Sequence, residues 1–200
     1  IKWVVDKHET IFDLISKNQQ ILKDLPVAAC AMEVCLLNWF ANFNGKELHE
    51  ILALPKASIP TSYTIGICSD KAIKERVEEN PNATYFKLKV SQSEFDRIIS
   101  TYQSVSNKPF VVDANQGFKS KNEALKCANK LNDLGVAYFE QPFSKKDLKA
   151  HAWLKSKTKI PIIADESFQR IGDIDHLLNS FDGINVKIMK TGGLIEAKKA

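Results

Sequence analysis

The sequence predicts an α/β protein built on a parallel (β/α)8-type (TIM) barrel, of which about six strands are present. Short apolar runs end repeatedly on a charged residue, as in the run that reaches Asp113. From Lys89 onward, these charged strand ends are spaced by 24, 27, 25 and 22 residues, which is the length of one strand and its crossover helix. The expected strands cover residues 62–67, 83–89, 109–113, 136–140, 160–165 and 183–187.

The segment before the first strand shows helical rather than strand periodicity. The stretch 26–40 begins with Pro26 and is apolar on nearly all sides, which predicts a helix at the centre of a helical bundle. Residues 55–60 lie between two prolines and read as a linker. We therefore expect a helical domain over residues 1–57 and a partial barrel over residues 58–200. The expected helices of the first domain cover residues 8–23, 26–40 and 46–54.

Composition and charge indicate an ordinary soluble globular protein. The chain has 200 residues, a hydrophobic fraction of 44% and a net charge of +4. Its lysines are scattered without interleaved aromatic residues, which favours a solvated basic face over a nucleic-acid site. The four cysteines form no CxxC pair, which predicts free thiols in a reducing compartment. No apolar stretch approaches the roughly 20 residues of a membrane span, and no signal peptide opens the chain. We expect a cytoplasmic protein.

Helix-capping signals follow three of the charged strand ends. The usual interpretation of a carboxylate after a strand is that it caps the next helix. Here capping boxes that begin with Ser lie further along the chain, so the charged residues at the strand ends are not needed as helix caps and are candidates for a functional site. The four histidines lie on stretches of helical character and are expected at the surface. The predicted capping boxes are Ser91 with Glu94, Ser120 with Glu123, and Ser144 with Asp147.

Three of the strand-end residues are carboxylates: Asp113, Glu140 and Asp165. All strands of a parallel barrel end at one rim, so these side chains should converge. They would repel one another and raise one another's pKa unless a cation lay among them. Oxygen ligands without His or Cys suit Mg²⁺ best. The sequence therefore predicts a magnesium site.

Lysines stand at two other strand ends. Lys87 and Lys89 lie two apart on one strand and face the same way, and near a cation they should lower each other's pKa. Lys187, from the sixth strand, is expected on the opposite side of the pocket. Such a pair could remove and return an α-proton on opposite faces of a substrate whose enediolate is stabilised by metal. An alternative is that Lys87 and Lys89 mark a solvent-facing edge strand, and that residues 190–193 form a plain turn.

These residues together resemble the enolase superfamily, in its muconate-lactonizing subgroup. The resemblance covers about residues 61–193, and the helices before it resemble the helical part of that family's capping domain. Residues 61–67 and 113–118 look most like dipeptide epimerases of the L-Ala-D/L-Glu type. The motifs that carry the resemblance are Lys87-Leu-Lys89, Val112-Asp-Ala-Asn115, Phe139-Glu-Gln-Pro142, Ala164-Asp-Glu-Ser167, and Asn185-Val-Lys187 through Gly192-Gly193.

The resemblance implies an Mg²⁺-dependent epimerase of dipeptides, with Lys89 and Lys187 as the acid/base pair; a lysine base with Mg²⁺ is typical of that superfamily. Lys187 is preferred over Lys190 because it stands at the strand end. Lys87, Thr64 and Asn115 would contact the substrate. The family's N-terminal sheet and its seventh and eighth strands have no counterpart in this sequence.

Other activities stay open. A muconate-type cycloisomerase, an o-succinylbenzoate synthase or an N-acylamino-acid racemase would use the same kind of site, and a non-catalytic barrel binding module is a further alternative. In each enzymatic case we expect the partner to be a small-molecule carboxylate. We expect no nucleic-acid or membrane partner, and a homo-oligomer is possible.

Overall fold

A computed structural model describes residues 10–200, which form two compact units. One unit comprises the described residues up to Ser58 together with Gln169–Asp173 and Val186–Ala200, and the other comprises Ile59–Phe168 and Ile174–Asn185. We call them the helical unit and the barrel unit. His8, where the first helix was expected to begin, lies outside the described residues. The predicted domain boundary at residue 57 stays a prediction about the whole protein.

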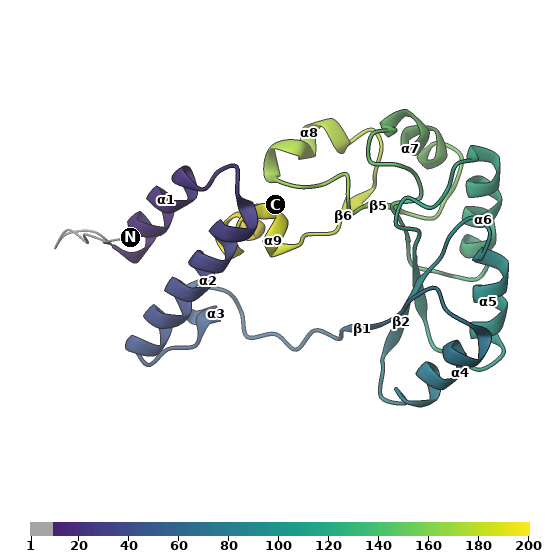
Figure 1. The fold of residues 1–200 in the computed structure, drawn as a ribbon, viewed down its shortest axis with the longest axis horizontal. Coiled ribbons are helices and arrows are strands. Elements are labelled where there is room, and N and C mark those ends of the chain that lie inside the picture. Colours follow the sequence, from purple (N-terminus) through teal and green to yellow (C-terminus); the bar gives the residue numbers. More distant parts are fainter. Residues whose placement is uncertain (1–9) are drawn as a thin grey trace. The chain divides into compact units, whose positions relative to one another are not determined.

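The barrel unit contains a six-stranded parallel sheet whose strands follow one another in sequence order (Figure 1). Neighbouring strands pair in parallel throughout the sheet. This order confirms the predicted partial (β/α)8 barrel, because each parallel step requires a crossover connection. The strands are β1 (Ser62–Ile65), β2 (Tyr85–Lys89), β3 (Phe110–Asp113), β4 (Phe139–Glu140), β5 (Ile162–Ala164) and β6 (Gly183–Ile184).

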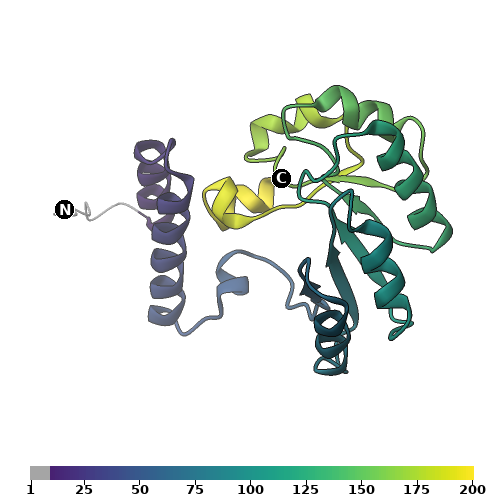
Figure 2. The ribbon, with the colours of Figure 1, turned by 45° about the vertical axis from the view of Figure 1, so that its right-hand side comes forward.

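Helices connect successive strands and cover the outer side of the sheet (Figures 1 and 2). Each presents apolar residues at helical spacing, such as Ala124, Cys127, Ala128 and Leu131 of the helix after β3, to the sheet. The connecting helices of the barrel unit are α4 (Asp70–Glu78), α5 (Phe95–Gln103), α6 (Lys121–Asp133), α7 (Leu148–Lys155) and α8 (Ile174–Leu177).

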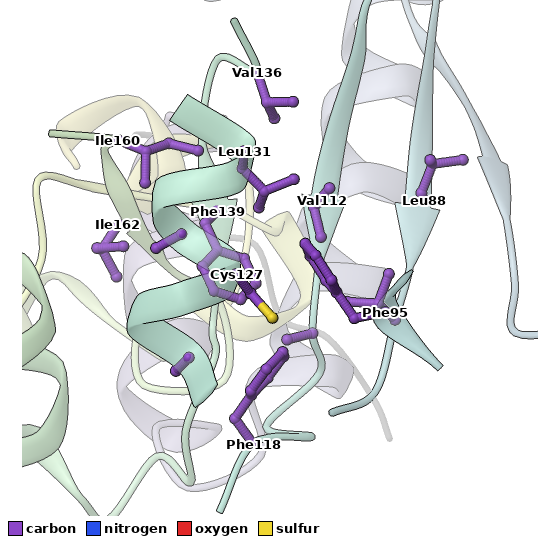
Figure 3. Packing of buried hydrophobic residues seen from close by; sticks show 14 of the residues in the cluster. Leu88, Phe95, Val112, Phe118, Cys127, Leu131, Val136, Phe139, Ile160 and Ile162 are labelled. Carbon is purple, nitrogen blue, oxygen red and sulfur yellow. The ribbon is translucent and has the colours of Figure 1, made fainter. Parts of the chain in front are cut away.

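The core of the barrel unit lies between this helical layer and the sheet. The side chains of strand β2 alternate between the two faces of the sheet. Phe86 and Leu88 are fully buried, whereas Lys87 and Lys89 are only partly buried. Successive side chains of a strand point to opposite faces, so Leu88 packs toward the helices, as expected. Figure 3 shows Leu88 with Phe95, Val112 and Leu131 among the side chains that fill this layer. The opposite face carries Lys87 and Lys89 together with apolar residues such as Val111, which pairs in register with Lys87.

At one of the three predicted capping boxes, the structure confirms the serine as the N-cap residue. Ser120 caps α6 and accepts a hydrogen bond from the Glu123 amide. The other two predictions are wrong: α5 begins after Glu94 without a side-chain cap, and Asp147, not Ser144, caps α7. A turn of chain separates each serine from the first helical residue, so the serine hydroxyls cannot reach the helix ends. Asp113 and Glu140 do not cap the helices that follow them, because Ser120 caps α6 and Asp147 caps α7.

The helical unit is organised around its longest helix, α2, which packs against α1, α3, α9 and α10. Thr10 and Asp13 form a capping box at the start of α1, and Pro26 opens α2 as predicted. A small core joins Ile15, Leu37 and Leu52. The elements of this unit are α1 (Ile11–Ile21), α2 (Pro26–Phe43), α3 (Leu48–Ile51), the short 3-10 helix η1 (Ile171–Asp173), α9 (Ile188–Thr191) and α10 (Leu194–Lys199).

Helix α2 is not buried on all sides, contrary to the sequence prediction. Among residues 10–200, only one face of α2 is covered, and Val27, Trp39 and Phe43 on other faces are 59–76% exposed. Over its 18 residues the mean hydropathy is 1.3, so α2 is long and apolar enough to cross a membrane by length and composition alone. This corrects the expectation that no stretch approaches that length. The indication is weak, because core helices of soluble proteins pass the same test.

Candidate active site

The structure brings the three predicted carboxylate ligands together in the barrel unit. Asp113 and Glu140 are the last residues of β3 and β4, where they pair in register, and Asp165 directly follows β5. One carboxylate oxygen from each lies within 4.8 Å of the others. All three side chains are buried, with exposures of 1–2%. Three neighbouring parallel strands therefore bring three carboxylates close together at their carboxyl ends.

This arrangement fits a divalent metal ion. Carboxylates that are fully buried at such short separations repel one another strongly in a medium of low dielectric constant. Their donor atoms are all oxygen, which suits Mg²⁺ rather than zinc or copper. Asp113, Glu140 and Asp165 would hold the ion, which leaves the rest of an octahedron for water or substrate oxygens.

Lys87 reaches from β2 into the carboxylate group. Its Nζ lies 2.9 Å from Asp113 Oδ2 and 2.8 Å from Glu140 Oε2. Burial lowers the pKa of Lys87, but the hydrogen bonds and charges of Glu140 and Asp113 outweigh it and raise this pKa overall. This upward shift reflects the protein groups alone, in which two carboxylates contact Lys87. The expected lowering of its pKa by Lys89 near a bound cation stays a prediction.

Glu140 is held in place by two donors. Besides Lys87, the side-chain amide of Asn185, which follows β6, donates to Glu140 Oε1 at 2.8 Å. Burial raises the pKa of Glu140, the hydrogen bond from Lys87 lowers it, and the charge of Asp113 raises it further, with a net upward shift. The sequence predicted that neighbouring carboxylates raise one another's pKa, and the charge of Asp113 has this effect on Glu140. The role of Asn185 was missed, although it stands in one of the quoted motifs.

Lys89 and Thr64 lie at the edge of this group on neighbouring strands. Lys89 is the last residue of β2 and pairs in register with Asp113. Thr64 of β1 pairs in register with Lys87 and is exposed. Residues in register on adjacent parallel strands point to the same face of a sheet, so both side chains share the face that bears the carboxylates. Their predicted roles in proton transfer and substrate binding remain predictions.

Asn115 belongs to the turn after β3. Its φ of 41° places it in the left-handed region, which Asn tolerates better than most residues. Its amide donates to Asp113 Oδ1 at 2.9 Å, and its side chain donates to Glu166 Oε1 at 3.2 Å. This turn fixes one oxygen of a ligand carboxylate and links the loops after β3 and β5. Asn115 is exposed, which is compatible with its predicted contact with substrate.

Gln141, the residue after Glu140, was not predicted as a site residue. It is fully buried, and its Oε1 accepts hydrogen bonds from the amides of Asp165 and Ser167 at 2.9 and 3.0 Å. Its Nε2 donates to Ser167 Oγ at 2.8 Å. The side chain thus holds the loop that bears the third carboxylate. Sequence pattern alone could not separate this glutamine from an ordinary polar loop residue.

His151 of α7 is buried, which corrects the expectation of a surface histidine. Its Nε2 accepts the Phe143 amide at 3.3 Å, and its Nδ1 contacts the Asp147 carbonyl at 2.9 Å, an arrangement that assigns the proton to Nδ1. Phe181 packs on the ring. Burial lowers the pKa of His151 to about 4, although the Asp147 carbonyl opposes this shift. The neutral ring supports the loop that carries Gln141.

Lys187 differs from its predicted setting. Strand β6 ends at Ile184, and Lys187 is the N-cap residue of α9, with φ −115° and ψ 119°. Lys190 lies within α9 rather than in a loop. Both lysines belong to the helical unit, and the part of Lys187 in proton transfer stays a prediction. The strand is shorter than expected because the chain after Asn185 turns into a helix.

The fold and the site together define a class of protein. It is a (β/α) barrel with carboxylates at the carboxyl ends of three successive parallel strands, which form a candidate divalent-metal centre. A sequence profile described as Enolase C-terminal domain-like matches residues 70–200. The chain belongs to this family.

Relatives with assigned activities include dipeptide epimerases. The L-Ala-D/L-Glu epimerase of Bacteroides thetaiotaomicron is 33% identical over 189 residues, which cover 94% of this chain and 49% of that protein. The L-Ala-D/L-Glu epimerase of Bacillus subtilis is 30% identical, over 90% of this chain and 52% of that protein. The chain thus spans about half the length of the curated relatives it matches.

Solved structures show the same fold. The dipeptide epimerase of Cytophaga hutchinsonii, in complex with Mg and the dipeptide D-Ala-L-Val, matches with a TM-score of 0.82 and 25% identity, over 94% of this chain and 53% of that one. A muconate cycloisomerase of Azorhizobium caulinodans matches with a TM-score of 0.81 and 27% identity, over 94% of this chain and 56% of that one.

Proposed function

We propose that the protein to which this chain belongs is an Mg²⁺-dependent dipeptide epimerase that acts by 1,1-proton transfer. The observation that carries the proposal is the buried carboxylate group Asp113, Glu140 and Asp165 beside Lys89. Relatives named L-Ala-D/L-Glu epimerase support the substrate class, and the Mg and dipeptide bound to the Cytophaga hutchinsonii enzyme support the cofactor.

Each group has a defined task in this proposal. Mg²⁺, held by the three carboxylates, would neutralise the charge that develops on the substrate carboxylate when the α-proton leaves. Lys89 removes the α-proton from one face of the C-terminal residue of the dipeptide, and Lys187 delivers a proton to the other face; in the reverse direction these tasks are exchanged. Lys87 holds Asp113 and Glu140 in place and, with Thr64 and Asn115, orients the substrate.

A muconate-type cycloisomerase is the second candidate, favoured by the similarity to the Azorhizobium caulinodans structure. Its site would need the same metal ligands and one lysine base. An epimerase differs in needing a base on both faces of the substrate α-carbon. The test must therefore distinguish one-base from two-base chemistry.

The test is α-proton exchange in D₂O with Mg²⁺, using the natural-length protein and the two epimers L-Ala-L-Glu and L-Ala-D-Glu. We expect deuterium to enter the C-terminal residue of both epimers, as read by mass spectrometry. Lys89→Ala and Lys187→Ala should each abolish epimerization while Mg²⁺ binding is retained. Lys126→Ala, which changes an exposed lysine of α6, is the control and should behave like wild type.

Three results would contradict the proposal. Unchanged turnover in both lysine variants would remove their assigned roles. Absence of exchange in a wild-type protein that binds Mg²⁺ would favour the cycloisomerase, and absence of any Mg²⁺-dependent thermal shift would favour a binding module without catalysis.

A further inference from the structure

Glu33 is a carboxylate buried in the middle of α2, far along the chain from every predicted site residue. Its side chain is fully buried, which is rare for Glu unless the charge is partnered. Oε1 accepts the Ile195 amide at 3.0 Å, and Oε2 accepts a hydrogen bond from the Gln19 side chain. Burial raises the pKa of Glu33, while the amides of Ile195 and Leu194 oppose that shift. One carboxylate therefore joins α1, α2 and the start of α10.

The segment that contacts the Glu33 carboxylate contains two glycines, Gly192 and Gly193. Gly193 precedes α10 with a φ of 149°, a backbone conformation that residues other than glycine rarely adopt. A Cβ added at Gly193 would collide with the Glu33 carboxyl group. Gly192, also at positive φ, lies against the Ala29 side chain of α2. The absence of a side chain at Gly193 thus permits the close approach that brings the amide of Ile195 onto the carboxylate.

This contact is linked by hydrogen bonds to the residue after Lys187. The Gly193 amide donates to the Ile188 carbonyl at 2.9 Å. The buried Thr191 hydroxyl lies 3.2 Å from the Ile188 carbonyl and 3.1 Å from the Gly193 carbonyl. Helix α9, which begins directly after Lys187, also packs against α2. The segment from Lys187 to Ile195 is therefore one hydrogen-bonded turn fastened to α2.

We propose that Glu33 is a positioning residue that sets the location of Lys187 by fastening the α9–α10 turn to α2. The inference rests on the proposed function, in which Lys187 is one of the two proton-transfer lysines. A catalytic side chain must be held within a fraction of an ångström by the groups around it, and displacement by about 1 Å can reduce the rate by about a hundredfold. Glu33 should therefore matter for one half of the reaction only.

The experiment separates the two half-reactions in the natural-length protein. α-Proton exchange in D₂O is measured separately from L-Ala-L-Glu and from L-Ala-D-Glu. The epimer whose exchange disappears in Lys187→Ala is the one that Lys187 deprotonates. In Glu33→Ala we expect exchange from that epimer to fall by roughly tenfold to a hundredfold, while exchange from the other epimer, deprotonated by Lys89, changes little.

Two further variants test the geometry. Glu33→Gln keeps an acceptor for the Ile195 amide and should recover most of the lost exchange. Gly193→Ala pushes a methyl group against the carboxylate and should reproduce the one-sided loss, which keeps the test available if Glu33→Ala does not fold. The control is Glu50→Ala, which removes an exposed carboxylate that accepts the Glu47 amide at the start of α3 and should leave both exchange rates unchanged.

The outcomes are distinguishable. Equal loss from both epimers in folded Glu33→Ala and Gly193→Ala, or no loss in either, would overturn the positioning role. Absence of exchange from both epimers in the wild-type protein would instead refute the proposed function.

Discussion

Gln141 orients the loop of the third carboxylate without itself contributing a ligand oxygen. Its side-chain oxygen accepts the amides of Asp165 and Ser167, and its backbone amide donates to the Ile163 carbonyl at 2.9 Å. A buried amide of this kind has fixed partners on both sides. The third carboxylate is therefore oriented by a neighbour of the second.

We expect Gln141→Ala to weaken Mg²⁺ binding by about 10- to 100-fold, the usual effect of removing a group that orients a metal ligand. The backbone amides of Asp165 and Ser167 would lose their acceptor, and the loop of Asp165 would relax. Isothermal titration with Mg²⁺ measures the change. Gln103→Ala, at an exposed position on α5, is the control; equal affinity in both variants would show that Gln141 does not orient the site.

At the scale of elements, the helix after β4 is capped by a different residue from the one that the sequence pattern predicts. The pattern Ser144 with Asp147 resembles a capping box, but α7 begins at Leu148 and the Asp147 side chain accepts the Ala150 amide at 2.9 Å. Ser144 instead lies in the preceding turn, where its carbonyl accepts the Asp147 amide. The acidic residue of the apparent box is itself the cap.

Asp147→Ala should lower the free energy of unfolding by about 1 kcal/mol, the usual cost of losing a helix N-cap. Ser144→Ala should change it by less than about 0.5 kcal/mol, as for surface positions generally. Urea unfolding followed by circular dichroism compares the two variants. The reverse order of effects would mean that the serine caps the helix after all.

At the scale of the whole molecule, the buried histidine makes stability depend on pH. In the folded protein the pKa of His151 is lowered to about 4, against about 6.5 in an unfolded chain. Above pH 6.5 the ring is neutral in both states. As the pH falls from 6.5 toward 4, the unfolded chain takes up a proton that the folded protein does not, so stability is lost in this window.

This difference corresponds to a loss on the order of 3 kcal/mol between neutral pH and pH 4. His151→Gln should be less stable at pH 7, because a well-packed ring is lost, but its stability should fall less steeply between pH 6.5 and 4. Urea unfolding at several pH values checks the slope, with His176→Gln, at an exposed position on α8, as the control. Parallel curves for wild type and His151→Gln would contradict the assignment.

The sequence by itself determined the barrel and the identity of the candidate metal ligands. Both depend on local signals that survive folding: apolar runs that end on a charge, and a spacing that fits one strand and one helix. Because parallel strands end on the same side of a sheet, the chain positions of Asp113, Glu140 and Asp165 were enough to predict that they meet.

Only the tertiary structure decided how these groups are supported. Gln141, Asn185 and Glu33 are polar residues with hydrogen-bond partners far away in the sequence, and no periodicity marks a residue that makes such contacts. Lys87 likewise acquires a raised pKa from carboxylates that are 26 and 53 residues away in the chain. Sequence patterns record which face of an element is apolar, whereas the pairing of buried polar groups depends on which elements the fold brings together.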